Sequence, residues 1–174
     1  ILFGAHGGLS NPRKGGDLIL KGIEKIKFFL IKENFEIIVL GGKSNYEEKY
    51  NGVVFNFRKY EQSKEKQVLY HSAVDLTLSC ARAEALPQFL VETILCKNPV
   101  VTFNIGGINE IVSHKENGYL VNQSDINDFS KGIKFIIENK KNLNLERNIK
   151  FIKNEFSEKS VFKKYNEIIQ AFDK

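Results

Sequence analysis

Two glutamates in the segment CARAEALPQFLVE (residues 80–92), Glu84 and Glu92, could bind the hydroxyl groups of a ligand. A carboxylate binds vicinal hydroxyls well because each oxygen accepts a charge-assisted hydrogen bond, and sugar rings and ribose present such pairs. The spacing alone is not informative, because Glu138 and Glu146 repeat it in a stretch without other functional features. The surroundings of the first pair must therefore decide between a ligand site and two solvated charges.

A glycine-rich segment with two adjacent cations, GAHGGLSNPRKGG (residues 4–16), could bind a diphosphate. Glycine lets the backbone approach a ligand closely, and Arg13 and Lys14 add positive charge. The next helix is expected to begin at about Gly16–Asp17, with the positive end of its dipole on the same side. A polar surface loop is the alternative. Neither G-K-[ST] nor G-x-G-x-x-G occurs in the segment, so a nicotinamide or flavin cofactor has no support. Gly106–Gly107 form a second turn that either approaches a ligand or is a turn only.

Strand and helix patterns alternate along the whole chain. Short apolar runs predict strands, and apolar residues at helical spacing predict helices. The expected strands span residues 1–4, 36–42, 52–57, 75–79, 99–103 and 118–121, and the expected helices span residues 16–33, 63–73, 87–97, 109–114, 125–140 and 157–172. Asp125 and Ser157 are the expected caps of the last two helices. The sequence thus predicts an α/β fold, a Rossmann-like, doubly wound parallel sheet of about six strands with helices on both faces.

The predicted fold separates the two glutamate pairs. A doubly wound sheet binds its ligand outside the carboxyl ends of its strands. Glu84 falls in the loop after the strand at 75–79, and Glu92 falls in the second turn of the next helix, for which Pro87 suits the first position. The two carboxylates can then contact opposite ends of one ligand. Between them, phosphate can bind to backbone N–H groups at the start of the helix, those near Leu86, Pro87, Gln88 and Phe89.

Composition fits one ordinary globular domain, since the chain has 174 residues of which 42% are hydrophobic and 27% are charged. It opens with Ile1 and contains no Met, so we expect a piece of a longer protein. No segment is apolar for long enough to span a membrane, and no secretory signal opens the chain. Cys80 and Cys96 lie in apolar stretches and are expected to be buried thiols.

The net charge of +5 is concentrated in residues 140–174, which hold nine Lys or Arg against five Asp or Glu. This segment either favours an anionic membrane surface or another acidic partner, or is the solvated face of helices in a lysine-rich protein. The charge is not interleaved with aromatic residues in a pattern, so no nucleic-acid partner is expected.

The segment ALPQFLVETILCKNPVVTFNIGGINEIVSHKENGYLV (residues 85–121) resembles the donor-binding region of the retaining glycosyltransferases of family 4, which have the GT-B fold. The glutamate pair at Glu84 and Glu92, the CKNPVV turn, the GGINEIV loop and the ENGYLV strand occur in the order of that family. LSNPRKGG is similar to the S-D-P-R-K-G of one subgroup, EALPQ to its N-L-P-N, and FSEKSVFKKYNEII to the family's terminal helix. The resemblance runs along essentially the whole chain.

The resemblance implies one half of a GT-B enzyme, in which two Rossmann-like domains face a cleft. Residues 1–174 resemble the C-terminal domain, which binds the nucleotide-sugar donor. The N-terminal acceptor domain would lie outside this chain, and the isolated domain would be inactive. The expected partners are the donor, the missing domain and an acceptor that is a sugar or a lipid-linked sugar. The implied role is polysaccharide, lipopolysaccharide or glycoconjugate synthesis in the cytoplasm, with peripheral association at the inner face of the cell membrane left open.

The resemblance also implies a role for each candidate site residue. Glu84 would contact hydroxyls of the donor sugar, and Glu92 would contact the ribose. The remaining expected contacts are the diphosphate at Arg13 and Lys14, phosphate at the backbone of Leu86, Pro87, Gln88 and Phe89, the base at Phe57 and Arg58, and the donor-side loop at Gly106 and Gly107.

The implied chemistry is electrostatic. Breaking the bond between the anomeric carbon and phosphate leaves negative charge on the diphosphate, which preplaced cations and N–H groups stabilise most in the transition state. No D-x-D motif is present and the family is usually metal-independent, so neither a metal nor a cofactor is expected, and no general base is assigned. Where the family usually has an Arg directly after the first strand, this chain reads Gly-Ala-His, so which of Arg13, Lys14 and His6 contacts which phosphate stays open. Ala85 stands where many members have Gly.

Two alternatives remain at this point. A nucleotide-sugar epimerase of similar fold would need catalytic acids and a His from both domains, and this chain offers His6, His71 and His114 without a recognisable cluster. A catalytically inactive nucleotide-sugar-binding module would keep the donor site without the transfer. The identity of the sugar, nucleotide and acceptor and the oligomeric state stay open.

Overall fold

A seven-stranded β-sheet forms the middle layer of the computed structural model, which describes residues 1–172. The strands lie in the order β3-β4-β2-β1-β5-β6-β7. Their bounds are β1 (Leu2–Gly4), β2 (Ile37–Gly42), β3 (Tyr46–Tyr50), β4 (Val53–Lys59), β5 (Thr77–Ser79), β6 (Val100–Phe103) and β7 (Gly118–Val121). All neighbouring strands pair in parallel except β3 and β4. The predicted Rossmann-like, doubly wound sheet is therefore confirmed.

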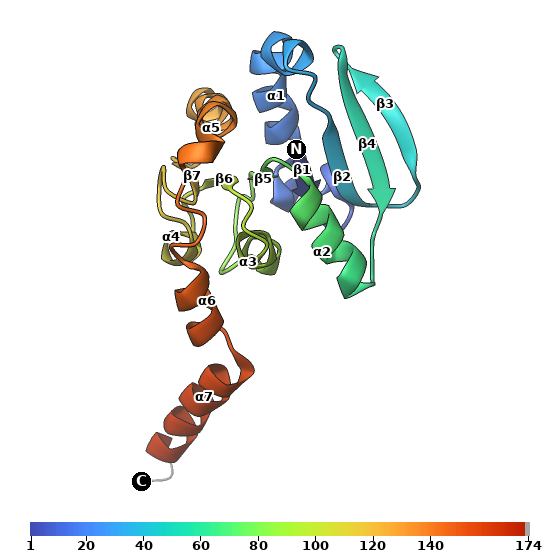
Figure 1. The fold of residues 1–174 in the computed structure, drawn as a ribbon. Helices are drawn as coiled ribbons and strands as arrows, with labels where there is room; N and C mark the ends of the chain where they lie inside the picture. Colours follow the sequence, from blue (N-terminus) through green and yellow to red (C-terminus); the bar gives the residue numbers. More distant parts are fainter. Residues whose placement is uncertain (173–174) are drawn as a thin grey trace.

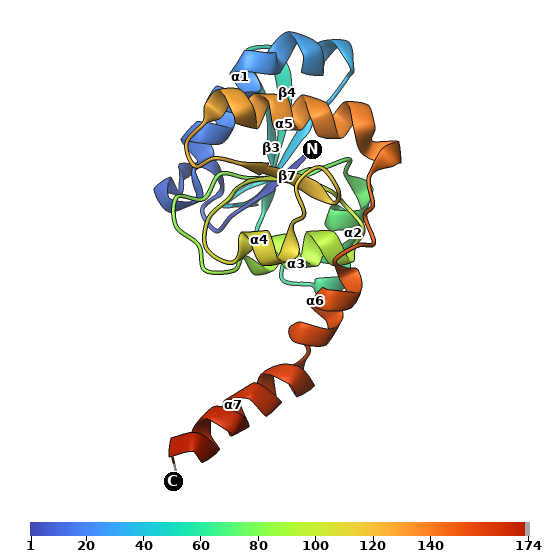
Figure 2. The ribbon, with the colours of Figure 1, turned by 90° about the vertical axis from the view of Figure 1, so that its left-hand side faces the viewer.

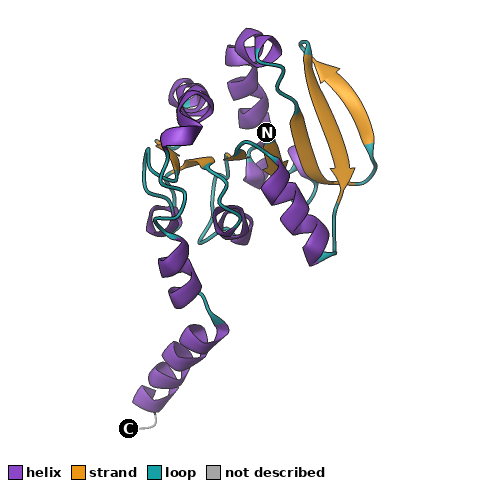
Figure 3. Cartoon of the chain, in the orientation of Figure 1, coloured by secondary structure: helices purple, strands orange, loops and turns teal. Residues whose placement is uncertain are grey.

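The antiparallel edge strand β3 is absent from the sequence prediction of about six strands. Its sequence, YEEKY, carries no apolar run, and every residue in it is exposed. The strand forms because it pairs with β4 and because Tyr46 stacks on Phe57, with 4.3 Å between ring centroids. Figure 3 shows the resulting hairpin at one edge of the sheet. Tertiary pairing thus overrides a weak local preference.

Helices cover both faces of the sheet (Figures 1 and 2). One face carries α1 (Gly16–Lys32) and α5 (Ile126–Asn139), which contact each other through a hydrogen bond from Ser130 Oγ to the carbonyl of Gly22 at 3.0 Å. The other face carries α2 (Lys64–Ala73), α3 (Gln88–Leu95) and α4 (Ile108–Ile111). Short 3-10 helices η1 (Gly8–Ser10), η2 (Pro12–Lys14) and η3 (Lys140–Asn142) complete the body. The main hydrophobic core lies between the sheet and α1 and α5, where side chains such as Ile23, Phe103 and Phe129 are fully buried.

The helix boundaries follow the predicted capping signals closely. The carboxylate of Asp125 accepts a hydrogen bond from the N–H of Asp128 at 2.9 Å, and Ser157 Oγ accepts one from the N–H of Ser160 at 3.2 Å. Pro87 lies one position earlier than predicted, because its ψ of 112° is extended and α3 begins at the next residue. The prediction of Pro87 as the first helical residue is therefore wrong by one position.

The described part of the chain closes with two helices, α6 (Ile149–Glu155) and α7 (Glu158–Phe172). Helix α7 extends away from the body of the structure in both views (Figures 1 and 2) and has no buried residue. Its exposed apolar side chains recur at helical spacing and form what we term the α7 stripe, which consists of Val161, Phe162, Tyr165, Ile168, Ile169 and Phe172. None of the described helices is both long and apolar enough to cross a membrane.

Both cysteines are free thiols, but only one matches the predicted burial. Cys80 is fully buried, and that burial raises the pKa of its thiol well above the ordinary value. Cys96 is half-buried at the end of α3, so the prediction of a buried thiol is wrong there. A helix end faces the solvent on one side, which a short apolar stretch of sequence does not reveal.

The order of the strands places the topological switch point of the sheet between β1 and β5. From β1 the chain proceeds to β2 and β4 on one side and then returns to β5 on the other. The two central strands pair with Leu2 opposite Thr77 and Phe3 opposite Leu78. Loops that leave the carboxyl ends of such strands diverge to opposite faces, and this switch point is where doubly wound sheets bind ligands.

Candidate functional site

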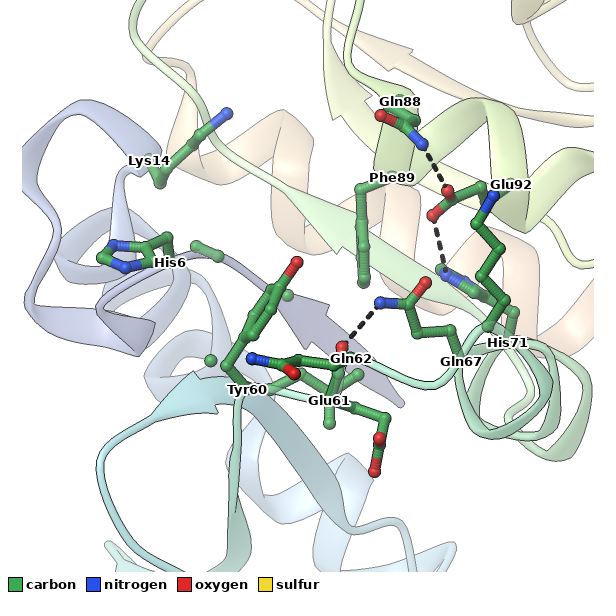
Figure 4. Close-up of a pocket in the computed structure, with 15 residues that line it drawn as sticks. His6, Lys14, Tyr60, Glu61, Gln62, Gln67, His71, Gln88, Phe89 and Glu92 are labelled. Atoms are coloured by element: carbon green, nitrogen blue, oxygen red, sulfur yellow. Dashed lines mark hydrogen bonds and ion pairs between the residues drawn. The ribbon is translucent and has the colours of Figure 1, made fainter.

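A pocket of about 450 Å³ opens at the carboxyl edge of the sheet, beside the switch point. Segments after β1, β2 and β4 line it together with helices α2 and α3 (Figure 4). Its volume falls within the range of small-molecule sites in proteins. The predicted location of a ligand site, outside the carboxyl ends of the strands, therefore coincides with a real cavity.

The side chain of Phe89 forms an apolar wall of the pocket. Its ring lies so close to Gly4 that a Cβ atom at that position would overlap with it, so a side chain there would require the ring to move. On its other side the ring packs against the imidazole of His71, with 4.7 Å between centroids. A flat apolar surface next to polar groups suits a ligand with both a planar and a hydroxylated part.

Glu92 projects into the pocket from the second turn of α3 (Figure 4). Its Oε1 accepts a hydrogen bond from Gln88 Nε2 at 2.8 Å, and its Oε2 lies 3.6 Å from His71 Nε2. The imidazole of His71 above all, and then Gln88, hold the pKa of the Glu92 carboxyl below its ordinary value, although partial burial opposes them. The group is therefore a carboxylate at neutral pH and can accept hydrogen bonds from hydroxyls.

Lys14 and Glu84 come together from loops that lie far apart in the sequence. Lys14 ends η2 and lines the pocket, and its Nζ forms an ion pair with Glu84 Oε2. The side chains are only 24% and 17% exposed, respectively. The lysine of the loop after β1 thus holds the glutamate of the loop after β5, although Glu84 itself is not one of the residues that line the pocket. Charges that are this protected from water interact strongly with any further charge that enters.

Arg13 lies outside the pocket, although it neighbours Lys14 in the sequence. It is exposed, and its backbone carbonyl accepts a hydrogen bond from the N–H of Arg82 at 2.8 Å. The guanidinium of Arg82 also contacts the carbonyl of Pro12 and, at 2.7 Å, the carboxylate of Asp17. The structure therefore separates the two predicted cations, and Arg82, which the sequence did not single out, fastens their loop to the loop after β5.

The backbone donors at the start of α3 are fewer than predicted. Pro87 has no N–H, and its carbonyl accepts bonds from Leu90 and Val91. The N–H groups of Leu86, Gln88 and Phe89 donate to no acceptor within residues 1–172. The predicted set of Leu86, Pro87, Gln88 and Phe89 is therefore corrected to three donors, because proline contributes none.

Phe57 and Arg58 do not line the pocket. Strand β4 continues two residues beyond its predicted end, so both belong to the strand, where Arg58 Nη1 donates to the carbonyl of Phe57 at 2.9 Å. The pocket wall begins after the strand, at Tyr60, Glu61 and Gln62 (Figure 4). The pocket wall therefore begins further along the chain than the residues predicted to hold a base, because β4 continues past its predicted end.

Gly106 and Gly107 support the loop that carries Glu84. Gly106 has a φ of 53°, and a Cβ atom there would overlap with the carbonyl oxygen of Glu84. The N–H of Gly107 donates to the carbonyl of Ala85 at 2.6 Å. Neither glycine lines the pocket. Both contact the backbone of the loop that carries Glu84.

Two histidines lie on opposite sides of the pocket, although the sequence showed no cluster (Figure 4). His6 follows β1. His71 belongs to α2 and is the residue of that helix that is buried. His114 lies elsewhere, where its Nδ1 accepts the N–H of Leu120 at 3.1 Å. Helical spacing alone could not separate His71 from a core residue. Among the described residues, no three His, Cys, Asp or Glu side chains form a group that could hold a metal ion.

The sequence matches the protein family described as "Glycosyl transferases group 1" over residues 8–156. An uncharacterized glycosyltransferase of Methanocaldococcus jannaschii is 28% identical over 142 residues, which are 79% of this chain and 38% of that protein. An uncharacterized glycosyltransferase of Haemophilus influenzae is 32% identical over 71 residues, which are 40% of this chain and 20% of that protein. These matches do not favour the epimerase alternative.

Solved structures that are less than 20% identical to this chain share its fold. Anabaena HepE in complex with UDP-glucose superposes with a TM-score of 0.76 at 19% identity, over 98% of this chain and 48% of that one. Sucrose-phosphate synthase of Thermosynechococcus elongatus gives a TM-score of 0.77 at 17% identity, over 98% of this chain and 45% of that one. The described fold is thus similar to a GT-B domain, and the chain spans less than half the length of these proteins.

Proposed function

Because this chain belongs to the group 1 glycosyl transferases, we propose that it forms the nucleotide-sugar-binding half of a retaining, family 4 enzyme. The observation that carries the proposal is the pocket at the switch point, where a lysine, a carboxylate and free backbone N–H groups converge. Two structures of a protein with the same fold contain UDP or UDP-glucose, which supports a nucleotide-sugar as the ligand of this chain.

The donor would span the pocket from α2 to the loop after β5. Its ribose hydroxyls would bind the Glu92 carboxylate, which faces the cavity and is ionised. Its diphosphate would lie at the start of α3, where free N–H groups and the helix dipole favour negative charge. Lys14 would exchange its contact with Glu84 for the phosphate, and Glu84 would then be free to accept hydroxyls of the sugar.

The proposed chemistry is the stabilisation of a leaving group. As the bond between the anomeric carbon and the phosphate oxygen breaks, negative charge develops on the diphosphate. Once the donor is bound and Lys14 has exchanged Glu84 for the phosphate, the lysine and the N–H groups of α3 would stabilise this charge without further reorganisation during the reaction. In this proposal the lysine takes the place of a divalent cation, and no metal or cofactor participates.

The base would lie between Phe89 and the segment Tyr60–Gln62, which form facing walls of the pocket. The carbonyl of Glu61 accepts a hydrogen bond from Gln67 Nε2 at 2.6 Å, so it has a partner within the protein. That bond fixes the shape of the segment, so a planar base would meet a preformed slot.

The proposed partner of the α7 stripe is the acceptor-binding domain of the same enzyme. The chain covers less than half of its solved structural relatives, and its last helix offers an uncovered apolar face. An acceptor that is a sugar or a lipid-linked sugar would bind between the two domains, in polysaccharide, lipopolysaccharide or glycoconjugate synthesis at the cytoplasmic side of the membrane. Without the second domain this chain would bind the donor but transfer nothing.

The test is calorimetric titration with UDP, GDP, ADP and their common sugar conjugates in the absence of divalent metal. We expect one nucleotide family to bind, Glu92→Ala to weaken it by about tenfold or more, and Lys14→Ala to do the same. Arg13→Ala should weaken nucleotide binding less than Lys14→Ala does, because Arg13 lies in the same loop but outside the pocket. Glu138→Ala is the matched control, because Glu138 belongs to the second pair with the same spacing and is exposed on α5. Equal affinities for the wild type and the Glu92 and Lys14 variants would refute the proposed site.

A further inference from the structure

The imidazole of His71 lies directly behind the carboxylate of Glu92 and is only 2% exposed. Three neighbours hold the residue in place. Its Nδ1 lies 2.8 Å from Thr93 Oγ1, its ring packs on Phe89, and its backbone carbonyl accepts a hydrogen bond from Asn98 Nδ2 at 2.8 Å. These contacts leave Nε2 as the ring nitrogen that faces the pocket side. This Nε2 points at Glu92 (Figure 4).

The hydrogen bonds of Thr93 decide which ring nitrogen carries a proton. Its single hydroxyl hydrogen can go to His71 Nδ1, to the carbonyl of Phe89 at 2.9 Å or, over the longer distance of 3.4 Å, to Thr77 Oγ1. In the first case the neutral ring keeps its proton on Nε2. In the other cases Nδ1 donates to the hydroxyl. The first arrangement places the N–H of the neutral ring on the side of Glu92, and the carboxylate there favours it, because an N–H is attracted to a negative charge and a nitrogen lone pair is repelled by it.

The distance between His71 Nε2 and Glu92 Oε2, 3.6 Å, exceeds that of a direct hydrogen bond, so the two groups attract each other across a short gap. Gln88 Nε2 fixes the other carboxylate oxygen at 2.8 Å. The carboxylate is therefore held between an amide on the exposed side and an imidazole on the buried side. This arrangement keeps it ionised and keeps its free lone pairs toward the cavity.

We propose that His71 is a positioning residue of the donor site, which orients the Glu92 carboxylate for the vicinal hydroxyls of a ribose. The inference rests on the proposed function, because it assigns the ribose to Glu92. His71 itself touches no substrate atom. It holds the half-exposed Glu92 side chain in one conformation before the ligand binds. The glutamate therefore loses less conformational entropy on binding.

The experiment compares His71→Leu and His71→Gln in full-length protein. Leucine fills the buried volume but carries no donor, whereas the glutamine amide can place an N–H near the position of Nε2. UDP, GDP and ADP are titrated first, and the tightest of them is then repeated as its 2′,3′-dideoxy form. We expect His71→Leu to weaken the ribonucleotide by roughly three- to tenfold and His71→Gln to recover most of that loss.

Two readouts separate positioning from a merely structural effect. In a Glu92→Gln background, His71→Leu should change the affinity by less than about twofold, because the group through which it acts is gone. With the 2′,3′-dideoxy nucleotide, the wild type and both single variants should bind alike. Independently of any nucleotide, a ¹³C titration of the Glu92 carboxyl should show a higher pKa in His71→Leu than in the wild type.

The outcomes separate the two proposals. If the wild type binds no nucleoside diphosphate, the proposed function fails, and the role of His71 fails with it. If the nucleotide binds and His71→Leu binds it equally well, only the positioning role is overturned. The same holds if the loss persists in the Glu92→Gln background or with the dideoxy nucleotide, because His71 would then act through the general stability of the domain.

Discussion

Replacing Thr93 by Val removes one buried hydroxyl at nearly constant volume. The hydroxyl is completely buried and lies 2.8 Å from His71 Nδ1 and 2.9 Å from the carbonyl of Phe89. The Phe89 carbonyl loses little, because the N–H of residue 93 still reaches it along the helix. The imidazole nitrogen, in contrast, is left buried without a partner. A buried polar group without a partner costs about 1–3 kcal/mol, so we expect Thr93→Val to lower the free energy of unfolding by about 2 kcal/mol.

The assay is urea unfolding at neutral pH, in which the midpoint should fall while the slope stays unchanged. Thr102→Val is the matched control, because Thr102 is equally buried but its hydroxyl makes only a long contact, 3.3 Å, with the carbonyl of Phe103. The double variant Thr93→Val/His71→Leu should be destabilised by at least about 1 kcal/mol less than the sum of the single variants, since both polar partners are then removed together. A loss below about 0.5 kcal/mol for Thr93→Val, or strict additivity in the double variant, would refute the reasoning.

Two further predictions test the carboxylates and their loop. His71 and Gln88 hold the pKa of Glu92 below its ordinary value of 4.5, so the stabilising effect of its charge exists above that value and disappears as the pH falls through the lowered pKa. Glu92→Gln should therefore be less stable than the wild type at pH 7, and this difference should shrink as the pH falls below 4.5, as urea unfolding across the acidic range can check; a constant difference would contradict the direction of the shift. Gly106→Ala should destabilise the chain by about 1–3 kcal/mol and weaken nucleotide binding, because the residue has a positive φ and faces the carbonyl of Glu84. Gly107→Ala, at a φ of −85°, is the milder control, and equal effects from the two would rule out strain as the cause.

The fold could be read from the sequence because its signals are local and repeated. Continuously apolar strands alternate with amphipathic helices, and caps such as Asp125 mark the ends. The one missed strand, Tyr46–Tyr50, carries no such signal. The strand forms because its backbone pairs with β4 at the edge of the sheet. Pairing of this kind depends on tertiary contacts and does not show in the local periodicity of the sequence.

The candidate site could be read only in part. The rule for doubly wound sheets selected the edge at which the pocket lies, and it separated Glu84 and Glu92 from the equally spaced pair in α5 and beyond. It could not tell that Lys14 turns toward the pocket while Arg13 turns to solvent, because neighbouring residues in a short 3-10 turn point in different directions. Nor could it locate the pocket wall at Tyr60, since that depends on where β4 ends.

The sequence by itself determined the order of most strands and helices, the membership of the group 1 glycosyl transferases and the edge of the sheet at which the pocket lies. These depend on residue type and spacing along the chain, which a sequence contains in full. The tertiary structure alone decided which side chains meet, namely Lys14 with Glu84 across 70 positions and His71 with Glu92 across a helix pair. Such contacts depend on packing between distant segments. On a helix, a shift of one position along the sequence turns the side chain from a buried direction to an exposed one.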